Sequence, residues 1–226
     1  MCKIKHALVM AAGRGMRMMP LTDLVPKAMA PFSGTTLIAD GIQKIRKHIS
    51  NVHITVGYKG AMLAKHVIEH DVLTLFNTEG KGNAWWVYNT LMKYVDEPVY
   101  VLTCDNVVDL QFDEIAEDYF KKNAPACMVV PVKPVEGLDG DYIFKENKLV
   151  SLITRDKTSD IYCSGIQVLN PAKVNRLTQK TESFNDLWNN LIKKKQLYCS
   201  DVLPIKWCAV DSIDQLDVLN KSLFKK

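Results

Sequence analysis

Short apolar runs alternate with longer helix-like stretches through the first half of the chain. The runs at 4–10, 52–57, 72–76 and 99–103 predict strands. Apolar residues recur at helical spacing within 36–49, and the stretches 61–69, 83–94 and 113–122 have helical character as well. This alternation is typical of a mainly parallel sheet covered by helices.

The pattern changes after residue 122. An apolar strand is predicted at 126–132, a hairpin at 141–145 and 148–153 around Glu146 and Asn147, and a further strand at 161–169. Alternation then resumes, with predicted helices at 171–178, 184–194 and 212–221 around strands at 197–202 and 206–210. We interpret residues 1–226 as one α/β domain in which 126–169 form a small antiparallel insertion.

Composition places the chain among folded proteins without a membrane span. The 226 residues are 47% hydrophobic and 24% charged, which suffices for a sizeable core. The net charge of +4 is small and its charges are interspersed, so nucleic acid is not an expected partner. No apolar run approaches the roughly 18 residues of a membrane helix, and the six cysteines are scattered without a Cys-x-x-Cys pair. We therefore expect a cytoplasmic protein with reduced thiols, no membrane partner, and an oligomer as an open possibility.

A glycine-rich loop follows the first predicted strand, where open α/β sheets bind ligands. It contains Ala11, Ala12, Gly13 and Gly15, whose small side chains allow close approach of phosphate oxygens to the backbone. The dinucleotide motif would require glycine at position 18, which is methionine, and the Walker Gly-Lys-Ser/Thr sequence is absent. A dehydrogenase and a P-loop protein are therefore both disfavoured.

Three motifs resemble one enzyme family. They are Ala-Ala-Gly-x-Gly-x-Arg-Met-x-Pro-Leu-Thr with the later Pro-Lys-Ala, Thr103-Cys104-Asp105-Asn106, and the segment 209–216. Together they are similar to the nucleotidyltransferases that join NTPs to sugar 1-phosphates and related phosphorylated acceptors. The resemblance spans essentially the whole chain. It implies a Rossmann-like, GT-A-like sheet, mainly parallel, with helices on both faces and an antiparallel insertion over the acceptor.

The resemblance also implies roles for charged residues. An acceptor phosphate oxygen would attack the α-phosphorus of an NTP, so both reactants are anions and catalysis depends on cations and alignment. Arg17 and Lys27 match the charge-stabilising pair of the family. Asp105 and Asp211 match its carboxylates for Mg²⁺, a metal that needs few protein ligands. Asp109 and Asp214 are alternative ligands, and Asp211 could instead cap a helix.

The nucleotide site implied by the resemblance includes the glycine loop and a second turn. Gly82 could pass under the base, and Asn83 could either hydrogen-bond the base or cap the following helix. Of the adjacent Trp85 and Trp86, at most one is expected at the site. The residues assigned to the nucleotide are Ala11, Ala12, Gly13, Gly15, Arg17, Lys27, Asn77, Gly82, Asn83 and Asp105.

The acceptor side departs from the hexose enzymes. A Glu-Lys-Pro-like motif is replaced here by Thr154-Arg155-Asp156-Lys157-Thr158, which weakens the sugar interpretation. The short chain and the segment 184–190 are similar to small bacterial phosphocholine cytidylyltransferases, and a related class acts on phosphorylated glutamine in capsule synthesis. Aromatic side chains would hold a quaternary ammonium by cation–π contact. The candidate acceptor residues are Arg155, Asp186, Trp188 and Trp207, with a core position as the alternative for both tryptophans.

We thus predict a Mg²⁺-dependent nucleotidyltransferase that transfers CMP from CTP, or another NMP, to a small phosphorylated acceptor of the phosphoglutamine or phosphocholine type for surface polysaccharide modification. A sugar 1-phosphate nucleotidyltransferase and a noncatalytic nucleotide-binding module are the alternatives. The noncatalytic module is disfavoured because the full set of charged residues is present, namely Arg17, Lys27, Asp105 and Asp211.

Overall fold

In the computed structural model, which describes residues 3–135, 138 and 140–223, the chain divides into two units. The loop unit comprises His6–Gly80, Leu102–Val108 and Cys208–Lys226, and the hairpin unit comprises Met1–Lys5, Lys81–Val101 and Asp109–Trp207. The proposed insertion, 126–169, falls entirely within the hairpin unit. Its assignment as an insertion into a single domain stays a prediction.

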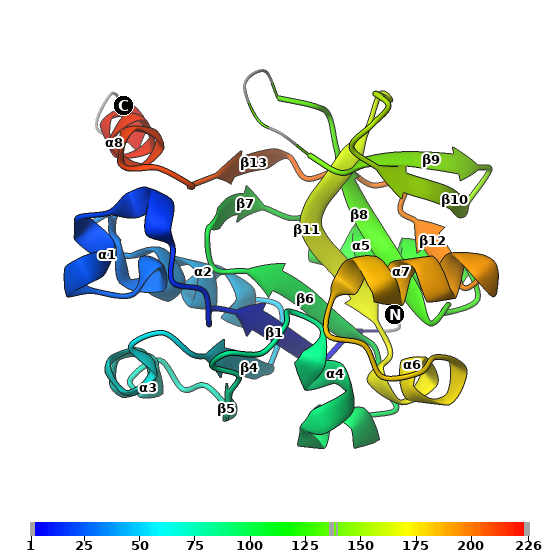
Figure 1. The fold of residues 1–226 in the computed structure, drawn as a ribbon, viewed down its shortest axis with the longest axis horizontal. Helices are drawn as coiled ribbons and strands as arrows, with labels where there is room; N and C mark the ends of the chain where they lie inside the picture. Colours follow the sequence, from blue (N-terminus) through cyan, green and yellow to red (C-terminus); the bar gives the residue numbers. More distant parts are fainter. Residues whose placement is uncertain (1–2, 136–137, 139, 224–226) are drawn as a thin grey trace. The chain divides into compact units, whose positions relative to one another are not determined.

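Three parallel strands form the sheet of the loop unit, in the order β5-β4-β1. They are β1 (His6–Met10), β4 (Asn51–Val56) and β5 (Thr74–Asn77). The centre of β1 is apolar and buried on both faces, as parallel strands usually are. Two helices, α2 (Leu37–Arg46) and α3 (Gly60–Ile68), pack against β4 (Figure 1). The side chain of Thr36 caps α2 by accepting the Ala39 N–H.

The remaining part of the loop unit is built from short elements that periodicity does not predict. They are η1 (Met16–Met18), α1 (Leu21–Leu24), η2 (Lys27–Met29), β2 (Pro31–Phe32) and β3 (Thr35–Thr36). An apolar cluster that includes Met18 of η1, Phe32 of β2, Val210 and Leu216 packs η1 and β2 with α8 (Ile213–Leu223). Burial of this cluster fixes the segment after β1 beside the segment that precedes α8.

The hairpin unit contains a mixed sheet in the order β6-β11-β8-β12-β10-β9. Its strands are β6 (Val99–Thr103), whose last two residues belong to the loop unit, β8 (Cys127–Val132), β9 (Tyr142–Glu146), β10 (Leu149–Thr154), β11 (Tyr162–Leu169) and β12 (Leu197–Cys199). The β8–β12 pair is parallel and the other described pairs are antiparallel. The predicted hairpin is thus present as β9 and β10. Two further strands, β7 (Asn106–Asp109) and β13 (Lys206–Ala209), have residues in both units.

Helices of the hairpin unit follow the sequence prediction with one exception. The elements are α4 (Trp85–Asn89), η3 (Leu91–Tyr94), α5 (Phe112–Lys121), α6 (Pro171–Leu177) and α7 (Phe184–Lys193), of which α7 packs against β10 and β12 (Figure 1). The single helix expected at 83–94 is interrupted at Thr90, which has an extended backbone. Its Oγ1 donates to Trp86 O at 2.7 Å and accepts the Met92 N–H at 3.2 Å, so a side chain replaces the helical backbone bonds.

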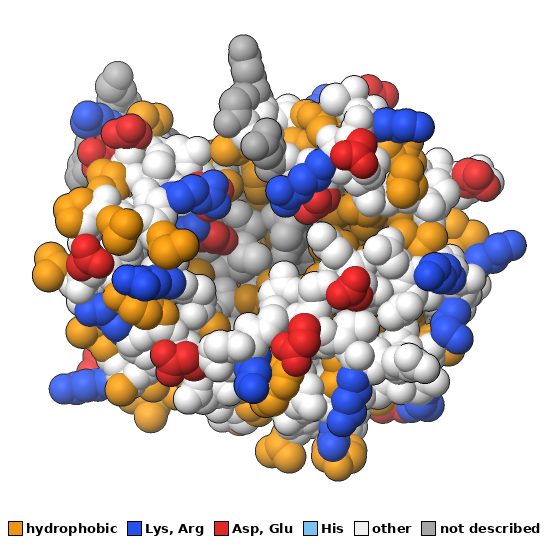
Figure 2. Space-filling view, viewed as in Figure 1, with side chains coloured by type: hydrophobic (Ala, Val, Ile, Leu, Met, Phe, Trp, Pro, Cys, Tyr) orange, Lys and Arg blue, Asp and Glu red, His pale blue; other side chains and the backbone are white. Residues whose placement is uncertain are grey.

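Charged side chains are mixed on the face that Figure 2 presents, where lysines and arginines lie among aspartates and glutamates. This agrees with the interspersed charges of the sequence. Within the described residues, no helix combines the length and the apolar composition that crossing a membrane requires. The cytoplasmic location stays a prediction.

Candidate active site

The loop after β1 is anchored at its start and open in its middle. Ala11 N–H donates to the carbonyl and the hydroxyl of Thr55, at 3.2 and 3.1 Å, and Ala12 O accepts the Tyr58 N–H at 3.0 Å. A Cβ added at Gly13 would meet no heavy atom within 4 Å. The loop therefore has a fixed backbone with free space beside Gly13, which suits close approach of phosphate oxygens.

Gly15 is required because Lys27 passes directly over it. Gly15 has a left-handed φ of 67°, and a Cβ there would lie 2.7 Å from Lys27 Cβ and 3.0 Å from Lys27 Cδ. Its carbonyl accepts the Thr22 hydroxyl at 3.1 Å. The absence of a side chain at Gly15 thus leaves room for the Lys27 side chain, a role that the motif alone does not reveal.

The Lys27 ammonium contacts both predicted metal carboxylates. Nζ lies 2.7 Å from Asp105 Oδ2 and 2.9 Å from Asp211 Oδ1, and the lysine side chain is only 11% exposed. Burial alone would lower the Lys27 pKa, but the two carboxylates, Asp105 foremost, outweigh burial and raise it. Arg17, 75% exposed, contacts Asp211 Oδ1 through Nη2 at 2.9 Å. The four predicted charged residues therefore form one cluster within the loop unit.

Backbone bonds hold the two aspartates in place. Cys104 N–H donates to Met10 O at 3.1 Å, which ties the residue before Asp105 to the end of β1. Val210 N–H donates to Asp105 O at 2.8 Å, which places the residue before Asp211 beside Asp105. Of the alternative ligands, Asp214 is exposed in the first turn of α8, while Asp109 is exposed and belongs to the hairpin unit.

A capping box leaves the Asp211 carboxylate free for the cluster. Ser212 Oγ accepts the Gln215 N–H at 3.3 Å, while Gln215 Oε1 accepts the N–H groups of Asp211 and Ser212 at 2.6 and 3.1 Å. The side chain of Asp211 is thus not the helix cap. Sequence reasoning missed Gln215, although the Ser-x-x-Gln spacing is a readable capping signal.

The donor set fits a divalent cation. Asp105 and Asp211 converge on a single cation, the Lys27 ammonium, and each remains about a quarter exposed. Among the described residues no group of three or more His, Cys, Asp or Glu side chains could hold a metal. An ion here would therefore have few protein ligands and would complete its shell with phosphate oxygens and water, as Mg²⁺ commonly does.

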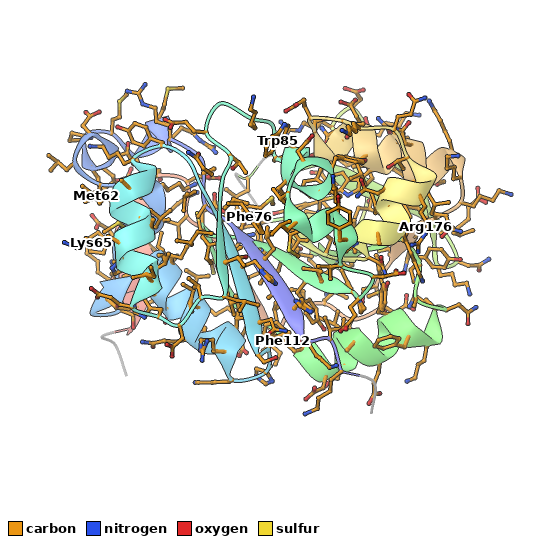
Figure 3. All side chains as sticks on the ribbon, turned by 90° about the horizontal axis from the view of Figure 1, so that it is seen from below. Met62, Lys65, Phe76, Trp85, Phe112 and Arg176 are labelled. Carbon is orange, nitrogen blue, oxygen red and sulfur yellow. The ribbon has the colours of Figure 1, made fainter. Side chains whose placement is uncertain are left out.

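The turn predicted to face the base has its own internal contacts. In the loop unit, Asn77 Oδ1 accepts the Glu79 N–H at 3.0 Å. In the hairpin unit, Asn83 Oδ1 accepts the Phe184 N–H at 2.9 Å, so Asn83 does not cap α4, whose N-cap is Ala84. Trp86 is buried in the core, whereas Trp85 is half-buried at the start of α4, with the Lys81 ammonium 5.7 Å from its ring (Figure 3).

Two predicted acceptor residues lie on α7. Trp188 is 8% exposed, donates from Nε1 to Gln167 Oε1 at 2.9 Å and stacks on Phe184, so it occupies the core position that was its alternative. Asp186 is exposed and its carboxylate accepts the Ser183 hydroxyl at 2.7 Å, where Ser183 caps the helix.

The other two acceptor candidates lie near the hairpin. Trp207 is half-buried, donates to Ser164 O at 2.9 Å and meets the ring of Tyr162 edge-on at 5.8 Å. Arg155 is 67% exposed and donates to both carboxylate oxygens of Asp141, at 2.7 and 3.4 Å. Neither contacts Asp186 or Trp188 in any described interaction, and an acceptor role for the four residues stays a prediction.

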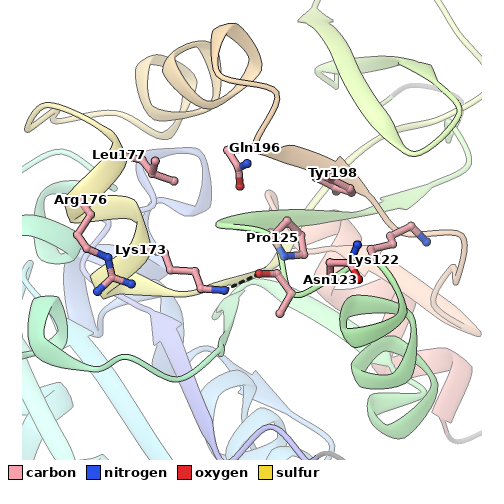
Figure 4. A pocket seen from close by; sticks show the side chains of 9 residues that line it. Lys122, Asn123, Pro125, Lys173, Arg176, Leu177, Gln196 and Tyr198 are labelled. Atoms are coloured by element: carbon pink, nitrogen blue, oxygen red, sulfur yellow. Dashed lines mark hydrogen bonds between the residues drawn. The ribbon is translucent and has the colours of Figure 1, made fainter.

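A separate cavity of about 540 Å³ in the hairpin unit is lined by none of the predicted residues (Figure 4). Its cations already have partners. Lys122 pairs with Asp118 and Asp201, Arg176 pairs with Asp96, and Lys173 donates to Ala124 O at 2.7 Å, the contact drawn in Figure 4. This cavity is therefore not part of the cluster around Lys27.

Comparison with known proteins decides the family. The family model described as nucleotidyl transferase matches residues 6–216. The chain belongs to the nucleotidyl transferase family. The resemblance of the glycine loop, the Asp105 segment and the Asp211 segment is confirmed at the level of this family, whose matched range contains every predicted site residue.

The curated relatives have low sequence identity to this chain and are longer than it. A mannose-1-phosphate guanyltransferase from Debaryomyces hansenii is 25% identical over 211 residues, covering 86% of this chain and 58% of the relative. The bifunctional protein GlmU from Methanocaldococcus jannaschii is 26% identical over 203 residues, covering 84% and 48%. The chain thus spans about half the length of these relatives.

Solved structures confirm the fold class. A putative glucose-1-phosphate thymidylyltransferase from Bacillus anthracis superposes with a TM-score of 0.81 at 15% identity, covering 98% of this chain and 96% of that one. An inositol-1-phosphate CTP transferase from T. maritima gives 0.80 at 16% identity, covering 99% and 95%. The CTP:phosphocholine cytidylyltransferase from Streptococcus pneumoniae gives 0.72 at 18% identity, covering 97% and 99%. The chain has the mixed, mostly parallel sheet with helices and small antiparallel sheets of nucleotidyltransferases.

Proposed function

We propose that this protein transfers a nucleotidyl group, CMP from CTP in the first place, to a small phosphorylated acceptor and releases pyrophosphate. Family membership supports nucleotidyl transfer as the reaction class. The observation that carries the proposal is the convergence of Arg17, Lys27, Asp105 and Asp211 beside the open glycine loop. A module that only bound nucleotide would have no need for this complete set of charges.

The chemistry needs charge neutralisation more than proton transfer. An oxygen of the acceptor phosphate forms a bond to the α-phosphorus of the NTP. The bond from that phosphorus to the oxygen bridging to the β-phosphate breaks, and its electron pair leaves with pyrophosphate. Lys27, held protonated by its raised pKa, and Arg17 reduce the repulsion between the two anions and orient the α-phosphate.

Asp105 and Asp211 are the residues that would hold Mg²⁺. When bound, the ion polarises phosphate oxygens as a Lewis acid and helps to align the triphosphate. The chain's own contribution is to fix the two carboxylates, through the Val210–Asp105 backbone bond and the Gln215 side chain.

The identity of the two substrates is the more specific part of the proposal. We propose CTP as the nucleotide and a phosphocholine or phosphoglutamine type of acceptor. Two of the structurally similar enzymes carry CTP in their names, although at this identity the likeness supports the fold alone. Arg155, with its guanidinium exposed, is suited to an acceptor phosphate, and the half-buried Trp207, whose ring meets the buried Tyr162 edge-on, offers aromatic surface. A role in surface polysaccharide modification belongs to this finer proposal.

A sugar 1-phosphate acceptor is the second candidate. It is favoured by the curated relatives, among which the D. hansenii enzyme is named as a mannose-1-phosphate guanyltransferase. The sequence in the hairpin region, with Arg155 where hexose enzymes carry a Glu-Lys-Pro-like motif, favours the smaller acceptors.

A pyrophosphate-release screen tests both candidates. Each of the four NTPs is combined with phosphocholine, phosphorylated glutamine and hexose 1-phosphates in the presence of Mg²⁺. We expect release with CTP and a non-sugar acceptor. Release only with hexose 1-phosphates would replace the finer proposal by the second candidate, and no release together with measurable NTP binding would favour the noncatalytic module.

A further inference from the structure

Two adjoining cavities of the hairpin unit are lined by cations. The cavity of Figure 4 has a volume of about 540 Å³, and a second one of about 470 Å³ shares Arg176 and Leu177 with it. We call these two spaces the Arg176 cavities. Among the described residues that line them, none is an aspartate or a glutamate, and four carry a positive charge, namely Lys122, Lys173, Arg176 and Lys194.

The charge of Lys122 is balanced within the protein. Lys122 and Lys145 face the carboxylates of Asp118 and Asp201, with Lys145 Nζ 3.0 Å from Asp201 Oδ1. Lys122 is also the C-cap of α5, where the helix end favours a cation. Lys122 therefore supports the fold and leaves no charge for a ligand.

The charges around Arg176 are not balanced. Arg176 contacts the two carboxylate oxygens of Asp96 at 3.3 Å each, whereas Lys173 Nζ donates to the uncharged carbonyl of Ala124 at 2.7 Å. Lys194 is exposed, and no described ion pair involves it. Three cations thus share one carboxylate, and the excess of positive charge is close to the roughly −1.5 to −2 of a phosphate monoester at pH 7.

Lys173 lies where its own helix does not favour a cation. It is in the first turn of α6, which begins at Pro171, and this end of a helix attracts negative charge. Arg176 and Leu177 follow at the i+3 and i+4 positions, so they lie on the same face as Lys173. Of the three ammonium hydrogens of Lys173 and the five guanidinium hydrogens of Arg176, the described bonds use one and two. This face of α6 therefore has donors left for an anion.

The remaining lining suits a polar molecule with apolar faces. Asn123 and Gln196 line the first cavity and Asn190 lines the second, and no described hydrogen bond uses their side-chain amides. Each amide offers both donors and an acceptor, which match the hydroxyl groups of a ligand. Pro125 and the ring of Tyr198 add apolar surface. Figure 4 shows Gln196 and Lys173 approaching the same space from different sides.

We propose that the Arg176 cavities bind a small phosphorylated sugar or polyol, whose phosphate is held by Lys173 and Arg176. The hydroxyl groups of the ligand bond to the amides of Asn123 and Gln196. Cavities of about 300 to 1,000 Å³ commonly hold organic ligands, so the volume is sufficient. The inference is independent of the proposed function, because no residue assigned to nucleotide, metal or acceptor lines these cavities.

Calorimetric titration with ribose 5-phosphate, ribose and inorganic phosphate tests this site. Lys173→Gln removes the charge and keeps a polar end. Lys193→Gln is the matched control, since it removes the same charge from an exposed residue at the end of α7 that lines neither cavity. Lys27→Ala shows whether the ligand binds at the glycine loop instead. Thermal melting checks that each variant is folded.

We expect the wild type to bind ribose 5-phosphate at least roughly tenfold more tightly than ribose or inorganic phosphate, because the phosphate and the sugar both make contacts. Lys173→Gln should weaken this binding by roughly tenfold, the scale of one lost charged hydrogen bond, while the other two variants should match the wild type. Absence of binding to the wild type, undiminished binding to Lys173→Gln, or binding abolished by Lys27→Ala would overturn the inference. Ribose or inorganic phosphate bound as tightly as ribose 5-phosphate would overturn it as well.

A second measurement applies if Lys173→Gln melts early. Ribose 5-phosphate is added to isotope-labelled wild type, and the backbone amide resonances are followed. The amides of Lys173 and Gln196 should shift more than those of Gly13 and Gly15, and the reverse order would overturn the inference. Neither experiment measures pyrophosphate release, so failure of the proposed function leaves the outcome for the Arg176 cavities unchanged.

Discussion

Substituting alanine at Gly15 tests whether the glycine loop positions Lys27. Two effects act on Gly15→Ala. The left-handed φ of 67° costs an alanine roughly 1 to 2 kcal/mol. In addition, the new Cβ would lie 2.7 Å from Lys27 Cβ, closer than van der Waals contact permits.

The second effect should be the larger for activity. The Lys27 Cβ cannot rotate away because it is attached to a backbone held by the bonds Met29 N–H to Pro26 O and Ala30 N–H to Lys27 O. The backbone must therefore shift, and Nζ loses its placement between Asp105 and Asp211. A displacement of about 1 Å is enough to lower turnover by roughly a hundredfold.

Gly34→Ala is the matched control. Gly34 has a similar φ of 76°, but nothing lies within 4 Å of its added Cβ. Both variants should lose a similar amount of stability from backbone strain, while only Gly15→Ala should lose turnover. Steady-state pyrophosphate release and urea unfolding measure the two quantities. Equal turnover in the two variants would refute the positioning role of Gly15.

Three other perturbations have defined outcomes. Asp105→Asn preserves shape but removes a charge, so turnover in Mg²⁺ should fall by at least roughly a hundredfold with little change in melting temperature; near-normal turnover would remove Asp105 from the metal site. Lys27→Ala should lower turnover, and unaltered kinetics for NTP and acceptor would make Lys27 structural. Burial, then the charge of His6, lowers the His53 pKa from 6.5 to about 4. The unfolded chain therefore binds more protons between these values, and the free energy of unfolding should fall by about 2 kcal/mol from pH 8 to pH 5. Urea unfolding at both pH values measures this; His53→Gln should reduce the difference, and an unchanged difference would contradict the assignment.

The spacing of apolar residues predicted the long helices and strands because apolar residues fall on the buried faces of these elements. The strands at 99–103 and 126–132 and the helix at 184–194 agree with β6, β8 and α7 to within one residue at each end. The break at Thr90 was missed, since it depends on one hydroxyl replacing helical backbone bonds. The short elements η1, η2, β2 and β3 were missed as well, because two or three residues cannot show a period.

The charged cluster could be named from the sequence only through family resemblance. Lys27 and Asp211 are 184 residues apart, and no local spacing brings them together. Their convergence follows from the fold, in which Val210 is bonded to Asp105 and the apolar cluster holds α8. By contrast, Gln215 lies three residues after Ser212, which caps α8. The capping-box spacing Ser-x-x-Gln therefore could have predicted the role of Gln215 from the sequence.

Glycine is required at position 82 for a reason other than the one that the motif suggests. A glycine in the turn before α4 suggested space for a base. The structure supplies another requirement, because any Cβ at Gly82 would collide with Glu182 O. The glycine therefore carries no evidence about the base by itself. The same holds for Asn83, whose Oδ1 accepts the Phe184 N–H within the hairpin unit, so contact of either residue with the base stays a prediction.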